Sequence, residues 1–436
     1  MRIDKEPDDV PVPMTAVASS SAATAEEAIP LLRRGISYHQ FYEQFMIPNK
    51  PCLIDRHLTQ SWSCRQEWIT DCDHINFDHL LSQFADDDVP VSDCASQYFN
   101  SQKSQEMKFS DFIRYWIKLI SDKHDYENNA CYYLKDWHFF LEHPDRPVYQ
   151  VPIFFEADWL NQHWLKDIAI HEPINDYRFV YMGPKGSSTP LHKDVYSSYS
   201  WSANICGEKE WILIAPDREE ILRRKYSQSG RDLPYDIRGL LTVPQFVKDI
   251  EPVIVKQTAG QVMFVPSDWI HQVRNTADTI SINHNWFNAC NLFFVWKGLL
   301  KALLDVQIQI SDLKQHNHQW AKECQNLLRI HHGLNFQDFV EILQTKVNLL
   351  GIESQSLTTS SQGKQVPDPL CTHNSSEETT IVTCSSPECS LLFRFRHEVQ
   401  TLTKFLPVLQ QELDKESGYS DFSLQVSTMM NKLLSL

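Results

Sequence analysis

The feature that most constrains this chain is a series of short apolar runs between residues 177 and 286. They are rich in β-branched and aromatic residues, as in YRFVYM, KEWILIA and TISINHNW, and turn-forming segments such as GPKGSS, TAG and NTAD separate them. Their length and composition predict about eight strands, which a polar stretch at 216–250 divides into two equal sets. Because no regular helical pattern alternates with the strands, the pattern favours a double-sheet jelly roll over a parallel sheet.

Helical patterns lie on both sides of these strands. In FSDFIRYWIKLI, at 109–120, the apolar residues fall on one face of a helix. Residues 292–306 predict a second helix, and residues 335–351 a third. In the third, Asn335 is suited to be the N-cap and Gly351 to end the helix.

Composition divides the chain into six segments. The upstream stretch FYEQFMIPNKPCLI predicts a short helix, a turn and a strand, and near the end Pro407 predicts a break in a helical segment. The predicted segments are a disordered tail at 1–30, an N-terminal helical and mixed flank at 31–176, the β core at 177–290, C-terminal helices at 291–353, a flexible Ser/Thr-rich insertion at 354–390 and a C-terminal helical segment at 391–436.

Charge and cysteine usage narrow the class of protein. A net charge of −16 without a dense Lys/Arg run argues against nucleic-acid binding, which needs a basic face. The 11 cysteines are scattered without a CxxC pair, and no cleavable signal precedes the core, so a reducing, cytoplasmic location is expected. The most apolar long segment, NLFFVWKGLLKALLDV, contains two lysines, and we expect no membrane insertion.

Three residues of the strand region form a candidate metal site. His192 and Asp194 are two residues apart in TPLHKDV, so on a strand both would point to the interior face while Lys193 points away. His271, in VPSDWIHQVRN, offers a third ligand from the second set of strands. Two histidines and one carboxylate are the facial triad typical of non-haem Fe(II) oxygenases, which leaves metal positions open for substrate and oxygen.

A second His-x-Asp tripeptide shows how weak the motif is when it stands alone. His143 and Asp145 lie in LEHPDRPV, where two prolines predict a loop. No strand followed by a lysine lies near them, so we interpret this pair as ordinary surface. For His192 and Asp194, a simple hydrogen bond at a strand end is the corresponding alternative.

Lys209 begins the apolar strand KEWILIAP and shares a face with Trp211. A lysine that points into a barrel is costly unless an anion meets it, and a dicarboxylate cosubstrate would supply one. The alternative is that Lys209 extends to water at the strand end. Thr189, Asn283 and Asn285 are candidates for hydrogen bonds to the same ligand.

Three stretches together resemble the jumonji-C family of 2-oxoglutarate oxygenases: YRFVYMGPKGSSTPLHKD, the GEK before an apolar strand, and GQVMFVPSDWIHQVRNTADTISINHNW. Nearly every strand of 177–290 takes part. The resemblance implies a mainly β core, a double-stranded β-helix of the cupin-like jelly-roll type, with N- and C-terminal helical flanks. It also implies that His192, Asp194 and His271 hold Fe(II), and that 2-oxoglutarate chelates the metal with its far carboxylate on Lys209.

The resemblance further marks Thr189 as a contact of that carboxylate. Ser202 stands where other members can carry Asn, so Ser202 and Asn204 are minor candidates, as is Tyr181.

The resemblance implies hydroxylation of a protein by O2 with conversion of 2-oxoglutarate to succinate and CO2. More narrowly, it implies a lysyl hydroxylase of the class-one translation termination (release) factor. The chain has neither a zinc-reader spacing nor a basic surface, which favours this over a lysine demethylase at chromatin. A non-catalytic metal-binding interaction module is the third hypothesis, and the oligomeric state stays open.

Overall fold

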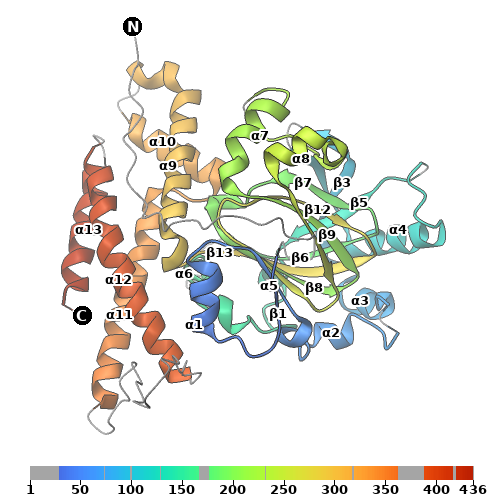
Figure 1. Ribbon diagram of the computed structural model, residues 1–436, viewed down its shortest axis with the longest axis horizontal. Coiled ribbons are helices and arrows are strands. Elements are labelled where there is room, and N and C mark those ends of the chain that lie inside the picture. The colour runs from blue at the N-terminus through green and yellow to red at the C-terminus, as the bar shows by residue number, and fades with distance from the viewer. Residues whose placement is uncertain are drawn as a thin grey trace.

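The computed structural model of the chain describes residues 29–72, 74–98, 101–127, 129–165, 176–230, 232–316, 319–361, 387–415 and 419–435. Residues 1–28 of the predicted tail lie outside the described residues. Figure 1 shows a β core with short helices around it and a separate layer of long helices beside it. No described helix is both long enough and apolar enough to cross a membrane.

Eight strands form between residues 178 and 286, as the sequence predicts. They are β6 (Arg178–Gly183), β7 (Ser188–His192), β8 (Tyr199–Cys206), β9 (Glu208–Ile214), β10 (Val253–Thr258), β11 (Val262–Val265), β12 (Ile270–Asn275) and β13 (Thr279–Trp286). Four of them make one sheet in the order β10-β9-β12-β7. The other four join a nine-stranded sheet, so the predicted double-sheet jelly roll is confirmed.

The nine-stranded sheet has the order β1-β2-β11-β8-β13-β6-β5-β3-β4. Its five additional strands come from the N-terminal flank: β1 (Leu31–Leu32), β2 (Cys52–Ile54), β3 (Asp88–Tyr98), β4 (Ser101–Lys108) and β5 (Tyr132–Trp137). Alternation decides what each face carries. On β13, Ile280 and Ile282 turn to the hydrophobic core, while Asn283 and Asn285 turn to the opposite face, toward the smaller sheet.

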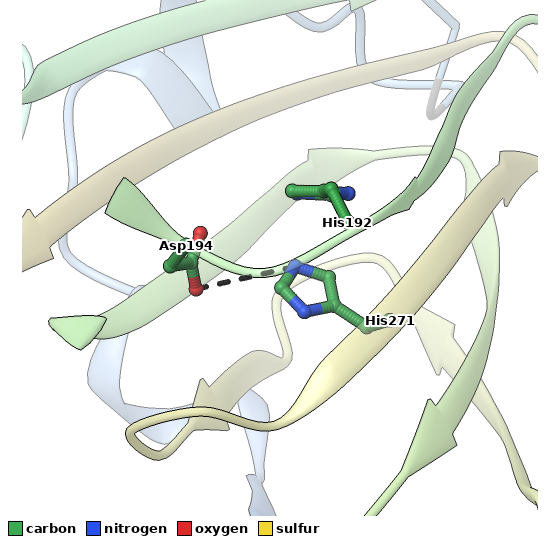
Figure 2. A group of neighbouring side chains, drawn as sticks. All are labelled: His192, Asp194 and His271. Atoms are coloured by element: carbon green, nitrogen blue, oxygen red, sulfur yellow. Dashed lines mark ion pairs between the residues drawn. The ribbon is translucent and has the colours of Figure 1, made fainter. Parts of the chain in front are cut away.

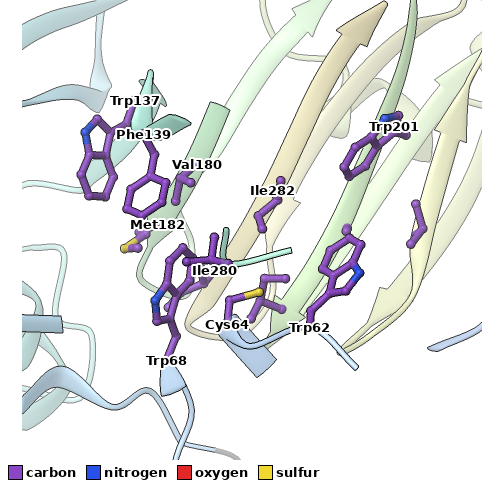
Figure 3. Packing of buried hydrophobic residues seen from close by; sticks show 14 of the residues in the cluster. Trp62, Cys64, Trp68, Trp137, Phe139, Val180, Met182, Trp201, Ile280 and Ile282 are labelled. Carbon is purple, nitrogen blue, oxygen red and sulfur yellow. The ribbon is translucent and has the colours of Figure 1, made fainter. Parts of the chain in front are cut away.

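The outer face of the nine-stranded sheet is covered by the main hydrophobic core (Figure 3). Trp137, Val180 and Met182 project from β5 and β6 on the same side as Trp68, while Trp62 lies next to Trp201 of β8, with ring centroids 6.3 Å apart. The helices α2 (Cys64–Glu67) and α3 (Phe77–Phe84) contribute side chains to the same core. Aromatic side chains pack on one face of the sheet. The polar residues of the other face line a cavity between the two sheets.

The predicted helices near the core are confirmed. FSDFIRYWIKLI lies in α4 (Phe109–Ser121), and the upstream stretch gives α1 (Tyr38–Phe41), a π-helical turn to Met46 and then β2. The remaining short helices are α5 (Phe139–Glu142), α6 (Trp159–Leu165), α7 (Glu219–Tyr226) and α8 (Pro244–Ile250).

The C-terminal layer packs five helices around its own hydrophobic cluster. They are α9 (Leu292–Gln309), α10 (Trp320–His332), α11 (Phe336–Ser361), α12 (Pro387–Asp414) and α13 (Ser420–Leu433). Asn335 caps α11 as predicted: its Oδ1 accepts from the backbone amide of Asp338 at 3.0 Å, and the Asp338 carboxylate accepts from the amide of Asn335 at 3.1 Å.

Two predicted helix boundaries in this layer are wrong. Gly351 lies inside α11, which continues to Ser361. The roughly 1 kcal/mol that an interior glycine costs does not end this helix, whose preceding turn is anchored by the buried Val347 and Leu350. Pro407 lies inside α12, where the buried Leu406 and Leu409 hold the helix together, and the break comes after Asp414.

Helix also reaches into both ends of the range predicted as a flexible insertion. Residues 354–361 belong to α11 and residues 387–390 to α12, and residues 362–386 lie outside the described residues.

Candidate active site

His192, Asp194 and His271 meet between the two sheets (Figure 2). Each offers one ligand atom, and these atoms lie within 4.8 Å of one another. The His271 Nε2 is 4.0 Å from the Asp194 Oδ2, and the two imidazole rings are 4.2 Å apart between centroids. Pairing of β12 with β7 sets His271 directly opposite His192.

The strand predicted for TPLHKDV is shorter than expected. β7 ends at His192, and Asp194 instead precedes a 3-10 turn at Val195–Ser197. The backbone of Asp194 is nevertheless extended, with φ −62° and ψ 148°, so the side chains two residues apart still point the same way. Tyr196 and Ser197 then take left-handed φ angles of 60° and 50°, which turn the chain into β8.

Hydrogen bonds orient each of the three side chains. The Nδ1 atoms of His192 and His271 lie 2.8 and 3.1 Å from backbone carbonyl oxygens, of Pro190 and Trp269 respectively. Both rings therefore keep Nε2 for a ligand bond. The Ser200 hydroxyl donates to the Asp194 Oδ2 at 2.6 Å. Burial lowers the pKa of His192 to about 4, which keeps the imidazole neutral, as metal binding requires.

This donor set fits a first-row divalent ion. Two imidazole nitrogens and one carboxylate oxygen converge from one side, the arrangement that suits Fe(II) and leaves its other coordination positions to small molecules.

Lys209 enters the same cavity from β9 and is only 2% exposed. Its Nζ donates to the Ser281 hydroxyl at 2.6 Å and lies about 6 Å from the rings of Tyr181 and Trp211. Within the described part of the chain, no carboxylate pairs with this ammonium. Burial therefore lowers its pKa to about 7, and an anion in the cavity would find a buried cation without a counter-charge.

The other predicted residues also gather here, except one. Thr189, Asn283 and Asn285 line the cavity, as do Ser202 and Tyr181.

The polar groups of this wall make few bonds to one another. The Asn283 side-chain amide donates to the Ser281 hydroxyl at 3.1 Å, and that of Asn285 donates to the Ser198 hydroxyl at 3.2 Å. The hydroxyl of Ser202 is buried without a partner among the described residues. Asn204 does not line the cavity, and its amide donates to the carbonyl of Gly207.

Sequence reasoning missed two contributors, Ser281 and Ser200. Ser281 shares the polar alternation of SINHN with Asn283 and Asn285, so that pattern held a signal for it. Ser200 gave none, because its contact with Asp194 depends on where β7 stops and the chain turns back.

A second cluster with metal-ligand chemistry involves the other His-x-Asp tripeptide. His143 Nε2 lies 2.7 Å from the Asp87 Oδ2, and Glu142 is near both. Asp145 is exposed and takes no part, which agrees with the interpretation of this pair as ordinary surface, but the side chain of His143 is only 18% exposed, so that interpretation is wrong for the histidine. The partners that His143 does find were not predicted.

Comparison with known proteins assigns residues 179–286 to a model described as JmjC domain, hydroxylase. A zebrafish (Danio rerio) protein, 2-oxoglutarate and iron-dependent oxygenase JMJD4, is 41% identical over 73% of this chain and 75% of the relative. The Arabidopsis thaliana arginine-specific demethylase JMJ20 is 38% identical over 70% and 66%, respectively. The Caenorhabditis briggsae bifunctional arginine demethylase and lysyl-hydroxylase psr-1 is 26% identical over 61% and 63%.

Proposed function

This chain belongs to the JmjC family and is an iron- and 2-oxoglutarate-dependent oxygenase, and from that premise we propose that it is a protein lysyl hydroxylase whose substrate is the class-one translation termination factor. The observation that supports catalysis is the meeting of three metal-ligand side chains in one cavity with a buried lysine that has no carboxylate partner among the described residues. The identity of the substrate rests on the family resemblance.

Each group in the cavity has an assigned role. His192, Asp194 and His271 hold Fe(II), and Lys209 receives the far carboxylate of 2-oxoglutarate. Iron with 2-oxoglutarate and O2 supplies the oxidation of the substrate C–H bond, with succinate and CO2 as the other products. Thr189 and Asn283 line the same cavity, which supports a role for them as donors to the cosubstrate.

The protein contributes position and charge. Carbonyl acceptors fix the ring orientation of both histidines, and Ser200 fixes the carboxylate of Asp194, so the ligands are held in place before the metal arrives. When 2-oxoglutarate enters, its carboxylate raises the pKa of Lys209 and keeps the ammonium charged.

A second candidate is demethylation of a methylated lysine or arginine. The name of the Arabidopsis relative favours it, and the name of the Caenorhabditis relative includes both reactions. The same oxidation of an N-methyl carbon would release formaldehyde. A third outcome, a metal-binding module without turnover, requires that 2-oxoglutarate is never consumed.

The test incubates the full chain with Fe(II), ascorbate and 2-oxoglutarate, with and without the recombinant termination factor. We expect succinate and a gain of one oxygen mass, about 16 Da, on a lysine of the factor, both lost in Asp194→Ala. Formaldehyde from a methylated peptide, with no mass gain on the factor, would replace the proposal by demethylation. Bound iron with no succinate from any substrate would leave only the non-catalytic reading.

A further inference from the structure

The inner face of the nine-stranded sheet continues beyond the metal cavity, over β6 and onto β5. The register of β5 on β6 shifts between Leu134 and Trp137, so that Lys135 and Asp136 together stand opposite Tyr181. Two residues opposite one make a β-bulge, a feature that re-aims a side chain and recurs beside active sites. Because Leu134 and Trp137 turn to the hydrophobic core, the bulge itself lies on the cavity side.

Asp136 has an unusual conformation in this bulge. Its φ is +63°, in the left-handed region that a residue other than glycine seldom adopts. The strained backbone brings its carboxylate to Tyr181, whose hydroxyl donates to Oδ1 at 2.6 Å. Tyr181 lines the cavity and Asp136 is exposed, so the carboxylate stands at the rim of the site.

Tyr181 connects this rim to the metal cavity. Its side chain lines the same cavity as the three metal-ligand residues, and its hydroxyl donates to the carboxylate of Asp136. The rim carboxylate is therefore one hydrogen bond away from the wall of the metal cavity.

A structural role does not account for the charge of Asp136. Asparagine tolerates left-handed φ angles at least as well, and its amide oxygen would accept the same bond from Tyr181. A carboxylate also offers several further acceptor positions, which a cation approaching the cavity could use.

We propose that Asp136 is the specificity-determining residue that receives the ammonium group of the substrate lysine. This inference rests on the proposed lysyl hydroxylation. Tyr181 lines the cavity and is hydrogen-bonded to Asp136, so its ring gives the aliphatic part of a lysine an apolar surface next to Asp136. The residue acts by touching the substrate and takes no part in holding iron or 2-oxoglutarate.

The test compares two probes that differ only in charge: Nα-acetyl-lysine N-methylamide and its norleucine counterpart. Ligand-observed NMR titrations on the full chain, with Mn(II), 2-oxoglutarate and no oxygen, give a dissociation constant for each. We expect the lysine probe to bind roughly tenfold more tightly, the low end for hydrogen bonds to a charged group because Asp136 is exposed. In Asp136→Asn we expect the two constants to be equal.

Asp93→Asn is the matched control. It removes the same charge from neighbouring β3, where the carboxylate is hydrogen-bonded to Ala95 and Ser96, and it should keep the preference for lysine. A preference that survives in Asp136→Asn, or is absent from the unaltered protein, overturns the inference. These titrations measure binding without turnover. A failure of the proposed function would instead appear as missing hydroxylation in the mass assay, so the two failures can be distinguished.

Discussion

Among the residues that the structure describes, two clusters bring histidine and carboxylate side chains close enough together to hold a metal ion, and they differ in whether their ligand atoms are already bonded. In the cluster of His192, Asp194 and His271, each imidazole has one nitrogen bonded to a backbone carbonyl and the other directed toward its neighbours. In the cluster of Asp87, Glu142 and His143, the groups already have partners. His143 bonds to Asp87 at 2.7 Å, and the Glu142 carboxylate accepts from the indole of Trp137 at 2.8 Å.

The surroundings of the two clusters also differ: the first lines a cavity, and aromatic side chains pack around the histidine of the second. The first opens onto a cavity that also holds a buried cation, Lys209. The ring of His143 is packed among aromatic side chains, with Phe84 and Phe139 about 5 Å away between centroids. Donor identity and proximity are therefore insufficient for a metal site. The donors must also be oriented by other bonds while their ligand atoms stay unengaged.

The largest expected difference between the clusters is in metal-dependent turnover. Asp194→Ala should lower kcat/KM by more than about 100-fold, since losing a ligand must exceed the 10- to 100-fold effect of losing an outer partner. Asp87→Ala should leave turnover and Fe(II) affinity unchanged. Succinate formation measures turnover, and metal titration measures Fe(II) affinity. Equal losses in the two variants would mean that the two clusters do not differ in metal binding.

The second effect concerns the buried lysine that only the first cluster has. Lys209→Met should raise the KM for 2-oxoglutarate by about 10- to 100-fold, the range for a hydrogen-bonded ion pair, because no other ammonium in the cavity can replace it. Fe(II) affinity without cosubstrate should hardly change. A lower affinity for the metal alone would instead place Lys209 in support of the ligands.

The sequence predicted which residues form the metal cluster better than it predicted the contacts that position them. The strand alternation that joined His192 to Asp194 holds for the backbone conformation, although the hydrogen-bonded strand ends at His192, two residues before Asp194. The role of Lys209 was predictable because burying a cation at the start of an apolar strand costs free energy unless an anion meets it. The contact of Ser200 and the bulge at Asp136 depend on strand register, which no local pattern specifies.

In the helical layer, local signals were overruled by packing. Gly351 and Pro407 are valid breakers for an isolated helix, but Pro407 lies between buried residues of the helical cluster, and Gly351 directly follows one of them, Leu350. Long-range burial of this kind cannot be read from a single helical segment.

The third expected effect is a pH dependence confined to cosubstrate binding. Burial sets the pKa of Lys209 at about 7, and a bound carboxylate raises it. Below pH 7 the lysine is already charged. Above pH 7 binding must take up a proton, so the KM for 2-oxoglutarate should rise by up to about tenfold per pH unit. In Lys209→Arg, whose guanidinium stays charged, the rise should disappear; a KM that rises equally in both proteins would assign it to another group.

A smaller effect is expected from the outer hydrogen bond that only the first cluster has. Ser200→Ala removes the donor to the Asp194 Oδ2 and should weaken Fe(II) binding about tenfold, the lower end for an outer partner. Ser82→Ala, an exposed serine in the flank, is the control for a lost hydroxyl. Unchanged metal affinity in Ser200→Ala would mean that the carboxylate is oriented by the backbone alone.

The smallest effect should appear in the second cluster, and it should be one of stability alone. In His143→Phe the new ring keeps the contacts with Phe84 and Phe139 but loses the bond to Asp87, whose side chain is 23% exposed and can turn to water. The free energy of unfolding should therefore fall by only about 1 kcal/mol.

Thermal melts with and without Mn(II) separate this loss of stability from an effect on metal binding. A metal at 100 times its Kd adds about 2.7 kcal/mol to the free energy of unfolding of a protein that binds it. That increment should be preserved in His143→Phe and lost in His271→Phe. If His143→Phe also lost it, the cluster of Asp87, Glu142 and His143 would be a metal site in its own right.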